Sequence, residues 1–304
     1  MKRAIVVLGI LVSLSVVGQQ VNYSVVEDAP RYTDLSIMPN VMCDVGGDAL
    51  GMGLGIEVDY RKKNLPFHIR AQAQKDFMVG WLNGITSNLH SGVQSSISNV
   101  ELGLALPFST STSKTSLPVT LESNLVSSSS TSETYNVTFV NVEGSIEKMK
   151  MIRGGLYARR GNWISSDFDN FKLQGFDYIA VQGDFMAKGI YGGISIMNRR
   201  NLKIKADDYG ECNETRHIEF YADFLFTPLT SFGTFTDNGG TEHDMDTKSN
   251  LEASKMGLRG GVIWKNGNFN GHGWYFKLET GLRPSVKGKG AFFAGAFGYA
   301  LNYK

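Results

Sequence analysis

Apolar and polar residues alternate with a period of two along several stretches of this chain. In residues 50–61, large apolar side chains such as Leu54 and Ile56 occupy one phase, whereas glycines and charged side chains such as Glu57 and Asp59 occupy the other. Only an extended chain places alternate side chains on opposite faces, so the pattern predicts a β-strand with one apolar and one polar face. Similar patterns predict strands at 35–43, 67–74, 99–106, 217–226, 256–265 and 274–283.

The last stretch of the chain, residues 289–304, alternates in a different way. Large side chains such as Phe293, Phe297 and Tyr299 share one face, and the other face carries small residues such as Ala296. This arrangement suits a strand with lipid on one side and a crowded or watery interior on the other. It predicts the closing strand of a membrane β-barrel, with the terminal strand of a soluble sandwich as the alternative.

Basic residues combined with Asn predict tight turns, because Asn tolerates the left-handed backbone that such turns need. Four such segments occur, at 61–64, 159–162, 199–201 and 265–268. If all four turns lie at the same end of the barrel, an even number of strands must separate each turn from the next. Weaker strands at 140–147, 152–159, 171–182, 190–197, 202–206 and 229–235 satisfy this condition. The prediction is an antiparallel barrel of about fourteen strands, or about twelve if the weak strands near Leu202 and Leu229 are merged with their neighbours.

The longer connections divide between the two ends of this barrel. The loops 78–95, 207–215 and 237–250 are expected at the end opposite the termini. The Ser- and Thr-rich segment 108–134 is expected at the same end as the termini, as a long connection, with a further strand at 117–125 as the alternative. Segments 153–163 and 259–269 resemble each other, which predicts two copies of one strand-turn-strand unit.

The chain begins with features of an export signal. Lys2 and Arg3 precede the apolar run 4–17, which is short for a membrane span, and Gly18 precedes a polar sequence. We expect residues 1–18 to be a cleaved signal peptide and residues 19–304 to form a single barrel domain. No comparable apolar run follows, so the mature chain could span a membrane only as a closed barrel.

The composition agrees with a β-rich protein. The 304 residues include 35 Gly and 11% aromatic residues, and the net charge is +1, so nothing indicates a nucleic-acid partner. The only two cysteines, Cys43 and Cys212, show no metal-ligand spacing. Export permits a disulfide between them, and free thiols fit the sequence equally well.

The leader, the alternating strands, the predicted asymmetry of short turns and long loops and the aromatic last strand together resemble the outer-membrane β-barrel proteins of Gram-negative bacteria. The sequence Gly18-Gln19-Gln20 is similar to signal-peptide ends common in Bacteroidota. The resemblance is to the architecture and not to a specific family. It implies location in the cell outer membrane, periplasmic termini, contact with outer-membrane lipid and lipopolysaccharide, and insertion by the barrel-assembly machinery.

The polar phase of the predicted strands identifies the side chains that should line the barrel lumen. Both signs of charge occur among them, which argues against strong ion selectivity. The predicted lumen-lining residues are Glu57, Asp59, Arg70, Arg153, Arg159, Glu219, Asp223, Arg259, Lys277, Glu279 and Arg283.

The same residues bear on function. His217, Glu219 and Asp223 share one strand face and form a candidate acid-base cluster, but charged pairs that neutralise each other usually fill barrel interiors. The acidic loop segments 207–211 and 241–246 lack the spacing of a calcium loop. The sequence therefore predicts no enzyme activity, no catalytic residue, no metal site and no cofactor.

Three function classes are compatible with the sequence. The first, and the principal hypothesis, is a porin-like channel for small solutes, which requires an open lumen. The second is a non-conducting structural, assembly or secretion-associated barrel that anchors partners in the membrane. The third, an outer-membrane enzyme, requires the His and carboxylate groups in the lumen to converge near the outer rim of the barrel.

Overall fold

The computed structural model describes most of the chain. The described residues are 21–28, 34–46, 50–62, 65–76, 89–90, 98–128, 133–165, 180–236, 242–248, 252–267 and 272–303. The predicted signal peptide, residues 1–18, lies outside them.

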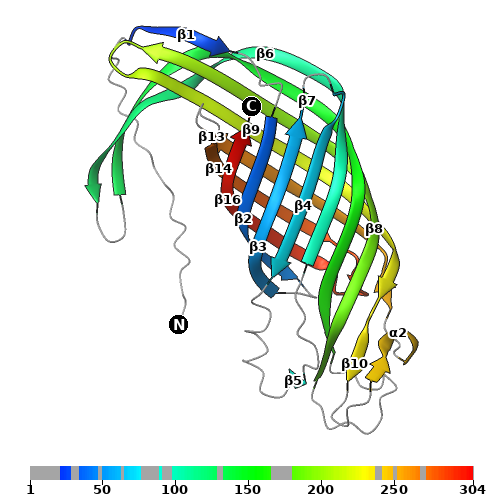
Figure 1. The fold of residues 1–304 in the computed structure, drawn as a ribbon. Helices are drawn as coiled ribbons and strands as arrows, with labels where there is room; N and C mark the ends of the chain where they lie inside the picture. Colours follow the sequence, from blue (N-terminus) through cyan, green and yellow to red (C-terminus); the bar gives the residue numbers. More distant parts are fainter. Residues whose placement is uncertain are drawn as a thin grey trace, which may run out of the picture.

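The fold is an all-β antiparallel barrel, as predicted (Figure 1). Each barrel strand pairs with the next along the chain, and the last strand pairs with the first, so the ring is closed. The ring contains ten strands: β2 (Asp34–Gly46), β3 (Leu50–Arg61), β4 (His68–Asp76), β6 (Ser98–Ser128), β7 (Glu133–Ser165), β8 (Ala180–Ala206), β9 (Gly210–Ser231), β13 (Met256–Gly267), β14 (His272–Leu282) and β16 (Ala291–Tyr303).

Short elements surround the ring. Outside it, β1 (Tyr23–Asp28) pairs with one end of β8, and the two-residue strand β5 (Leu89–His90) pairs with the other end. The remaining elements are β10 (Thr234–Thr236), β11 (Glu242–Asp244), α2 (Met245–Lys248), β12 (Ala253–Ser254) and β15 (Ser285–Val286). The described part of the chain has no helix that is long and apolar enough to cross a membrane.

The ring has fewer strands than the fourteen or twelve predicted. Three strands are much longer than expected, and each contains segments that the sequence suggested were separate. Thus β6 includes 99–106 and 117–125, β7 includes 140–147 and 152–159, and β8 includes 190–197 and 202–206.

The predicted turns at 159–162 and 199–201 are wrong, since both segments lie inside strands. Their basic residues are not at a solvated turn, because Arg159, Arg199 and Arg200 are buried. The similar segments 153–163 and 259–269 therefore do not form equivalent units: the first lies within β7, and the second leaves β13 toward a reversal of the chain. The chain does reverse after β3 and after β13, near the other two predicted turns.

The connections also differ from the prediction. The short connection between β8 and β9, at 207–209, lies at the same end of the barrel as the termini. The prediction of a loop 207–215 at the opposite end is therefore wrong. Segment 108–134 does lie at the terminal end, but its described residues are strand and not a loop. Most of 78–95 and half of 237–250 lie outside the described residues, and the described part of the second segment forms β11 and α2.

The outer face of the barrel is apolar. Leu54 of β3 is 55% exposed, Phe220 of β9 is 56% exposed and Phe297 of β16 is 52% exposed. In a soluble sandwich these rows would pack against each other, whereas here they form a belt around the closed sheet. The predicted faces of the closing strand agree with this: Phe293, Phe297 and Tyr299 point outward, and Ala296 is buried.

The hairpin β6–β7 continues beyond the barrel rim and arches over the end at which the C-terminus lies (Figure 1). We call its distal part, Ser109–Ser128 with Glu133–Ser145, the arm. The even-numbered side chains of β8 after Ile190 all point to the same face of the sheet, because the β8–β9 ladder has no register shift beyond this residue. Their exposure shows which part of that face the arm covers. Ile194 is 60% exposed on the outer face, but Leu202 and Ile204, in the same phase, are fully buried. The arm therefore packs against the continuation of the outer face of β8.

A small apolar core holds the arm in place. It combines Val119 and Val142 of the arm with Leu202 and Ile204 of β8 and with Cys212 of β9. On the opposite edge, Asp28 of β1 accepts hydrogen bonds from the amide and hydroxyl of Ser145. The arm is therefore a second layer of structure fixed by packing and by hydrogen bonds, and not a solvated connection.

Both cysteines are free: Cys43 is exposed on the outer face and Cys212 is buried under the arm. Burial raises the pKa of the Cys212 thiol, which lowers the thiolate fraction at neutral pH. In a Cys43→Ala background, we expect a water-soluble maleimide to modify Cys212 at least about tenfold more slowly than it modifies the unfolded protein. Val142→Ser, which weakens the core, should accelerate the reaction. Equal rates in the folded and unfolded protein would contradict the packing of the arm.

Candidate functional site: the polar interior

The inner faces of the strands place charged side chains from opposite walls in contact. Glu219 of β9 is fully buried and receives both terminal nitrogens of Arg70 from β4, with Nη1 to Oε1 at 2.7 Å and Nη2 to Oε2 at 2.5 Å. Arg153 of β7 lies 3.7 Å from the same carboxylate. Because β4 and β9 are not neighbours in the sheet, this bidentate pair crosses the lumen.

A second bidentate pair crosses the lumen beside the first. Arg259 of β13 donates to Glu101 of β6 at 2.6 and 2.7 Å, and its Nε donates to Asp223 at 3.0 Å. Glu279 lies 3.5 Å from the same guanidinium. Asp223 is also within 3.0 Å of Nε of Arg153, so the two bidentate pairs belong to one network.

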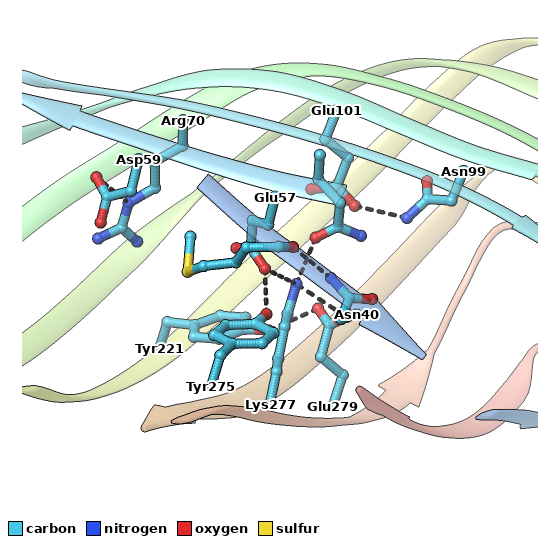
Figure 2. A network of polar contacts seen from close by, with 12 residues as sticks. Asn40, Glu57, Asp59, Arg70, Asn99, Glu101, Tyr221, Tyr275, Lys277 and Glu279 are labelled. Atoms are coloured by element: carbon cyan, nitrogen blue, oxygen red, sulfur yellow. Dashed lines mark hydrogen bonds and ion pairs between the residues drawn. The ribbon is translucent and has the colours of Figure 1, made fainter. Parts of the chain in front are cut away.

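The third part of the network involves β3 and β14 (Figure 2). The hydroxyl of Tyr275 donates to Glu57, and Nζ of Lys277 donates to Oε1 of Gln72 at 2.5 Å. Lys277 also lies 3.3 Å from Glu279, which accepts a hydrogen bond from the hydroxyl of Tyr221 at 2.6 Å. Each carboxylate therefore has a cation or a hydroxyl donor.

Aromatic rings fill the space between these charges. The guanidinium of Arg153 lies 4.1 Å from the ring centre of Tyr221 and 5.7 Å from that of Tyr191. Arg259 lies 5.1 Å from the Tyr191 ring. Such contacts favour a cation over the face of a ring, so the rings stabilise the two arginines while they exclude water from them.

Further ion pairs occupy the two ends of the lumen. Nη1 of Arg283 donates to Asp44 at 2.6 and 2.8 Å toward the end opposite the termini. Toward the terminal end, Lys265 donates to Asp59 at 2.9 Å, and Arg61 and Arg199 lie 3.3 and 3.6 Å from Glu147.

The residues predicted to line the lumen all lie on the inner face, and most belong to this network. All are buried except Asp59, whose side chain is 14% exposed. Arg159 lines a small cavity with Asp44 and Arg283. The prediction omitted other residues of this network, among them Asp44, Arg61, Gln72, Glu101, Glu147, Tyr191, Arg199, Tyr221, Lys265 and Tyr275. Glu101, Glu147, Tyr221 and Tyr275 carry the same polar-phase signal as the predicted residues, whereas Arg199 lies in a segment that was predicted to be a turn.

Small cavities lie between the lumen side chains of the part of the chain that the structure describes. Three cavities between the described residues have volumes of about 30, 20 and 10 Å³. A site needs at least about 10 to 15 Å³ to hold one water molecule. These cavities therefore fit isolated waters, and a hydrated solute would have to displace the ion pairs around them.

The candidate acid-base cluster is engaged in the network. Nε2 of His217 lies 3.7 Å from Glu219, but this carboxylate is already held by Arg70, and Asp223 is held by Arg153 and Arg259. A general base needs a free lone pair within reach of its substrate. Among the described residues, no group of His, Cys, Asp and Glu has the arrangement of a metal site.

No protein-family model matches this sequence, and no curated protein matches it significantly.

Proposed function

We propose that this protein is an outer-membrane β-barrel that does not conduct solutes and that anchors the arm at the periplasmic side of the membrane. The observation that carries the proposal is the ion-pair network, which joins opposite walls of the lumen. A porin-like channel requires a water path past Arg70, Glu219, Arg259 and Glu101, and these four side chains meet in the middle of the barrel.

The outer surface supports insertion into a membrane. A closed barrel satisfies the backbone hydrogen bonds of its strands, which is a requirement for strands in lipid. The exposed apolar belt would otherwise face water, and soluble monomers rarely expose so continuous an apolar surface. The periplasmic assignment of the termini follows from the resemblance to outer-membrane barrels, and it places the arm in the periplasm.

The network supports a structural role and not catalysis. Its carboxylates accept hydrogen bonds from arginine, lysine and tyrosine side chains that come from other strands. Buried charges that are paired across the lumen fix the relative position of the strands that carry them. The proposed function therefore needs no cofactor, metal or substrate in the lumen.

Conductance in planar bilayers tests the closed lumen. The purified wild-type protein should show no single-channel steps, because the network fills the path. The double variant Arg259→Ser, Arg283→Ser removes two fixed positive charges and should produce small currents that favour cations. Heat-modifiable migration on a detergent gel is the control for folding. Steady conductance of the folded wild type would support the porin-like channel instead.

Cell fractionation tests the location. The mature protein should fractionate with the outer membrane and float with liposomes after reconstitution. Recovery as a soluble periplasmic protein would contradict membrane insertion, because the apolar belt would then need another covering.

A further inference from the structure

The arm separates from the barrel wall at a fork between β7 and β8. The β7–β8 ladder extends to the pair Ile146 and Arg200, and from Leu202 onward β1 takes the place of β7 beside β8. At this fork lies a groove of about 350 Å³, between the arm and strands β7, β8 and β9. Its volume is within the range of small-molecule sites, about 300 to 1,000 Å³. It opens on the outer side of the sheet, because its lining residues Arg200 on β8 and Ile218 on β9 are in the outward phase. Only Arg199, which pairs with Glu147 in the lumen, lines it from the inward phase of β8.

The groove is positively charged. Its charged lining consists of four cations, Lys148, Arg199, Arg200 and Arg216, and one carboxylate, Glu214. Glu214 lies 3.4 Å from Arg216, and Arg199 is near the lumen carboxylate Glu147. The groove therefore keeps an excess of positive charge, and Lys148 and Arg200 have no ion-pair partner among the described residues.

Arg200 is the strongest indication of a missing ligand. Its exposed fraction is only 4%, yet its Nε and Nη2 have no hydrogen-bond acceptor among the described residues. The carboxylates of Glu214 and Asp28 attract this guanidinium without forming an ion pair with it, and Asp28 instead accepts hydrogen bonds from the amide and hydroxyl of Ser145. A buried charge without a partner is costly, so an anion in the groove would supply what the protein itself lacks.

The local backbone leaves space for this guanidinium. A Cβ atom at Gly144 of the arm would lie 3.3 Å from Nη2 of Arg200 and 3.3 Å from Leu202. A larger residue would therefore force the arginine to move. The glycine allows the side chain to lie between the arm and β8 at the groove.

The rest of the lining is apolar and leads to the belt. Ile146 and Ile218 line the groove, and the next outward residue on β9 is Phe220, which is 56% exposed. On β8, Ile196 points outward, is 40% exposed and lies next to the groove on the side of the belt. A ligand in the groove would thus have cations on one side and the apolar belt directly below it.

We propose that the groove binds the phosphate headgroup of an anionic glycerophospholipid in the periplasmic leaflet, with its acyl chains along the belt at Ile196 and Phe220. The phosphate would accept hydrogen bonds from Arg200 and Arg216, in the charge-assisted geometry that guanidinium and phosphate favour. Continuity of the groove with the apolar belt favours a lipid over a free phosphate. This inference rests on the proposed insertion into the outer membrane.

Native mass spectrometry of the full-length mature protein tests the inference. The protein is released from nanodiscs that contain equal amounts of phosphatidylglycerol and phosphatidylcholine, and the retained lipids are counted. The wild type should retain phosphatidylglycerol preferentially. Arg200→Gln and Arg216→Gln should each reduce this preference about tenfold, the loss expected for one charge-assisted contact. Lys188→Gln, an exposed cation at the opposite end of β8, is the matched control and should keep the preference.

Three results would overturn the inference. They are equal retention of the two lipids by the wild type, an unchanged preference in both groove variants, and loss of the preference in Lys188→Gln as well. Excess inorganic phosphate is added in a further arm, and complete displacement of the lipid by it would identify a free phosphate site instead. Arg216 has a half-exposed side chain, so its variant should fold even if Arg200→Gln does not.

Liposome flotation of the same samples separates this inference from the proposed function. A protein that floats but shows no lipid preference would reject the lipid site alone. A protein that does not float would reject the membrane barrel, and with it the lipid site.

Discussion

Replacing Arg259 with Met should lower the free energy of unfolding by about 3 to 5 kcal/mol, the cost of removing one partner from a buried ion pair. The guanidinium is 4% exposed and holds Glu101 through two hydrogen bonds and Asp223 through a third. Methionine fills a similar volume but leaves these carboxylates buried without their cation. Urea unfolding in lipid or detergent, followed by heat-modifiable migration, measures the effect.

Two further variants identify the cause of this loss. Lys75→Met removes an exposed cation from β4 and should change stability by no more than about 0.5 kcal/mol. Adding Glu101→Gln to Arg259→Met removes one of the stranded charges and should restore part of the lost stability, as expected for coupled residues. A loss of less than 1 kcal/mol in Arg259→Met would mean that the network contributes little to the fold.

Placing an arginine on the belt, in Phe220→Arg, should cost about 2 to 4 kcal/mol of folding into lipid if this position lies near the middle of the bilayer. The reason is desolvation: Phe220 points outward and is 56% exposed to the surrounding medium. Leu54→Arg on β3 should have a similar effect, since Leu54 is 55% exposed on the same outer face. The folded fraction after dilution from urea into liposomes measures both variants.

The control for this prediction is an inward substitution that keeps its hydrogen bond. Glu57→Gln retains an acceptor for the hydroxyl of Tyr275 and should fold nearly as well as the wild type. Equal sensitivity of Glu57 and Phe220 would mean that the faces are assigned wrongly. Glu219→Gln, although also inward, should be costly, because it removes the charge that Arg70 and Arg153 share.

The alternation of residues was enough to predict a part of each barrel strand and the two faces of these parts. The range predicted for β3, residues 50–61, agrees with the structure, and the closing strand has the expected outer aromatic row. Period two is a local property of the backbone, so a single sequence carries it. The closed barrel itself followed from these faces together with the absence of an apolar run long enough for a membrane helix.

The wrong predictions concern residue types that occur in more than one kind of structure. Basic residues with Asn occur at solvated turns, but Arg199-Arg200-Asn201 lies in a strand whose basic side chains are buried. The Ser- and Thr-rich part of β6 has too few apolar residues to show a period, and its strand is fixed by pairing with β7 and by the core around Val142. Such tertiary support is not visible in local sequence.

The pairing of acidic and basic side chains in the lumen could not be predicted from the sequence either. The polar phase indicated that Arg70, Glu219 and Arg259 point inward, but which acid meets which base depends on the number of strands and their stagger. A ring of ten strands brings opposite walls within the reach of two side chains, whereas a ring of fourteen would separate them. The prediction of a channel followed from the larger ring.

The pairing of β16 with β2 has a consequence for how the chain folds. The seam joins Ser36 to Asn302, which are 266 positions apart, so the ring closes only after the whole barrel sequence is available. Contacts between such distant segments form slowly, because the entropy of loop closure opposes them. Until that step, the edges of β2 and β16 are unpaired and open to association with other chains. Shielding these two edges until the ring closes would therefore limit such association.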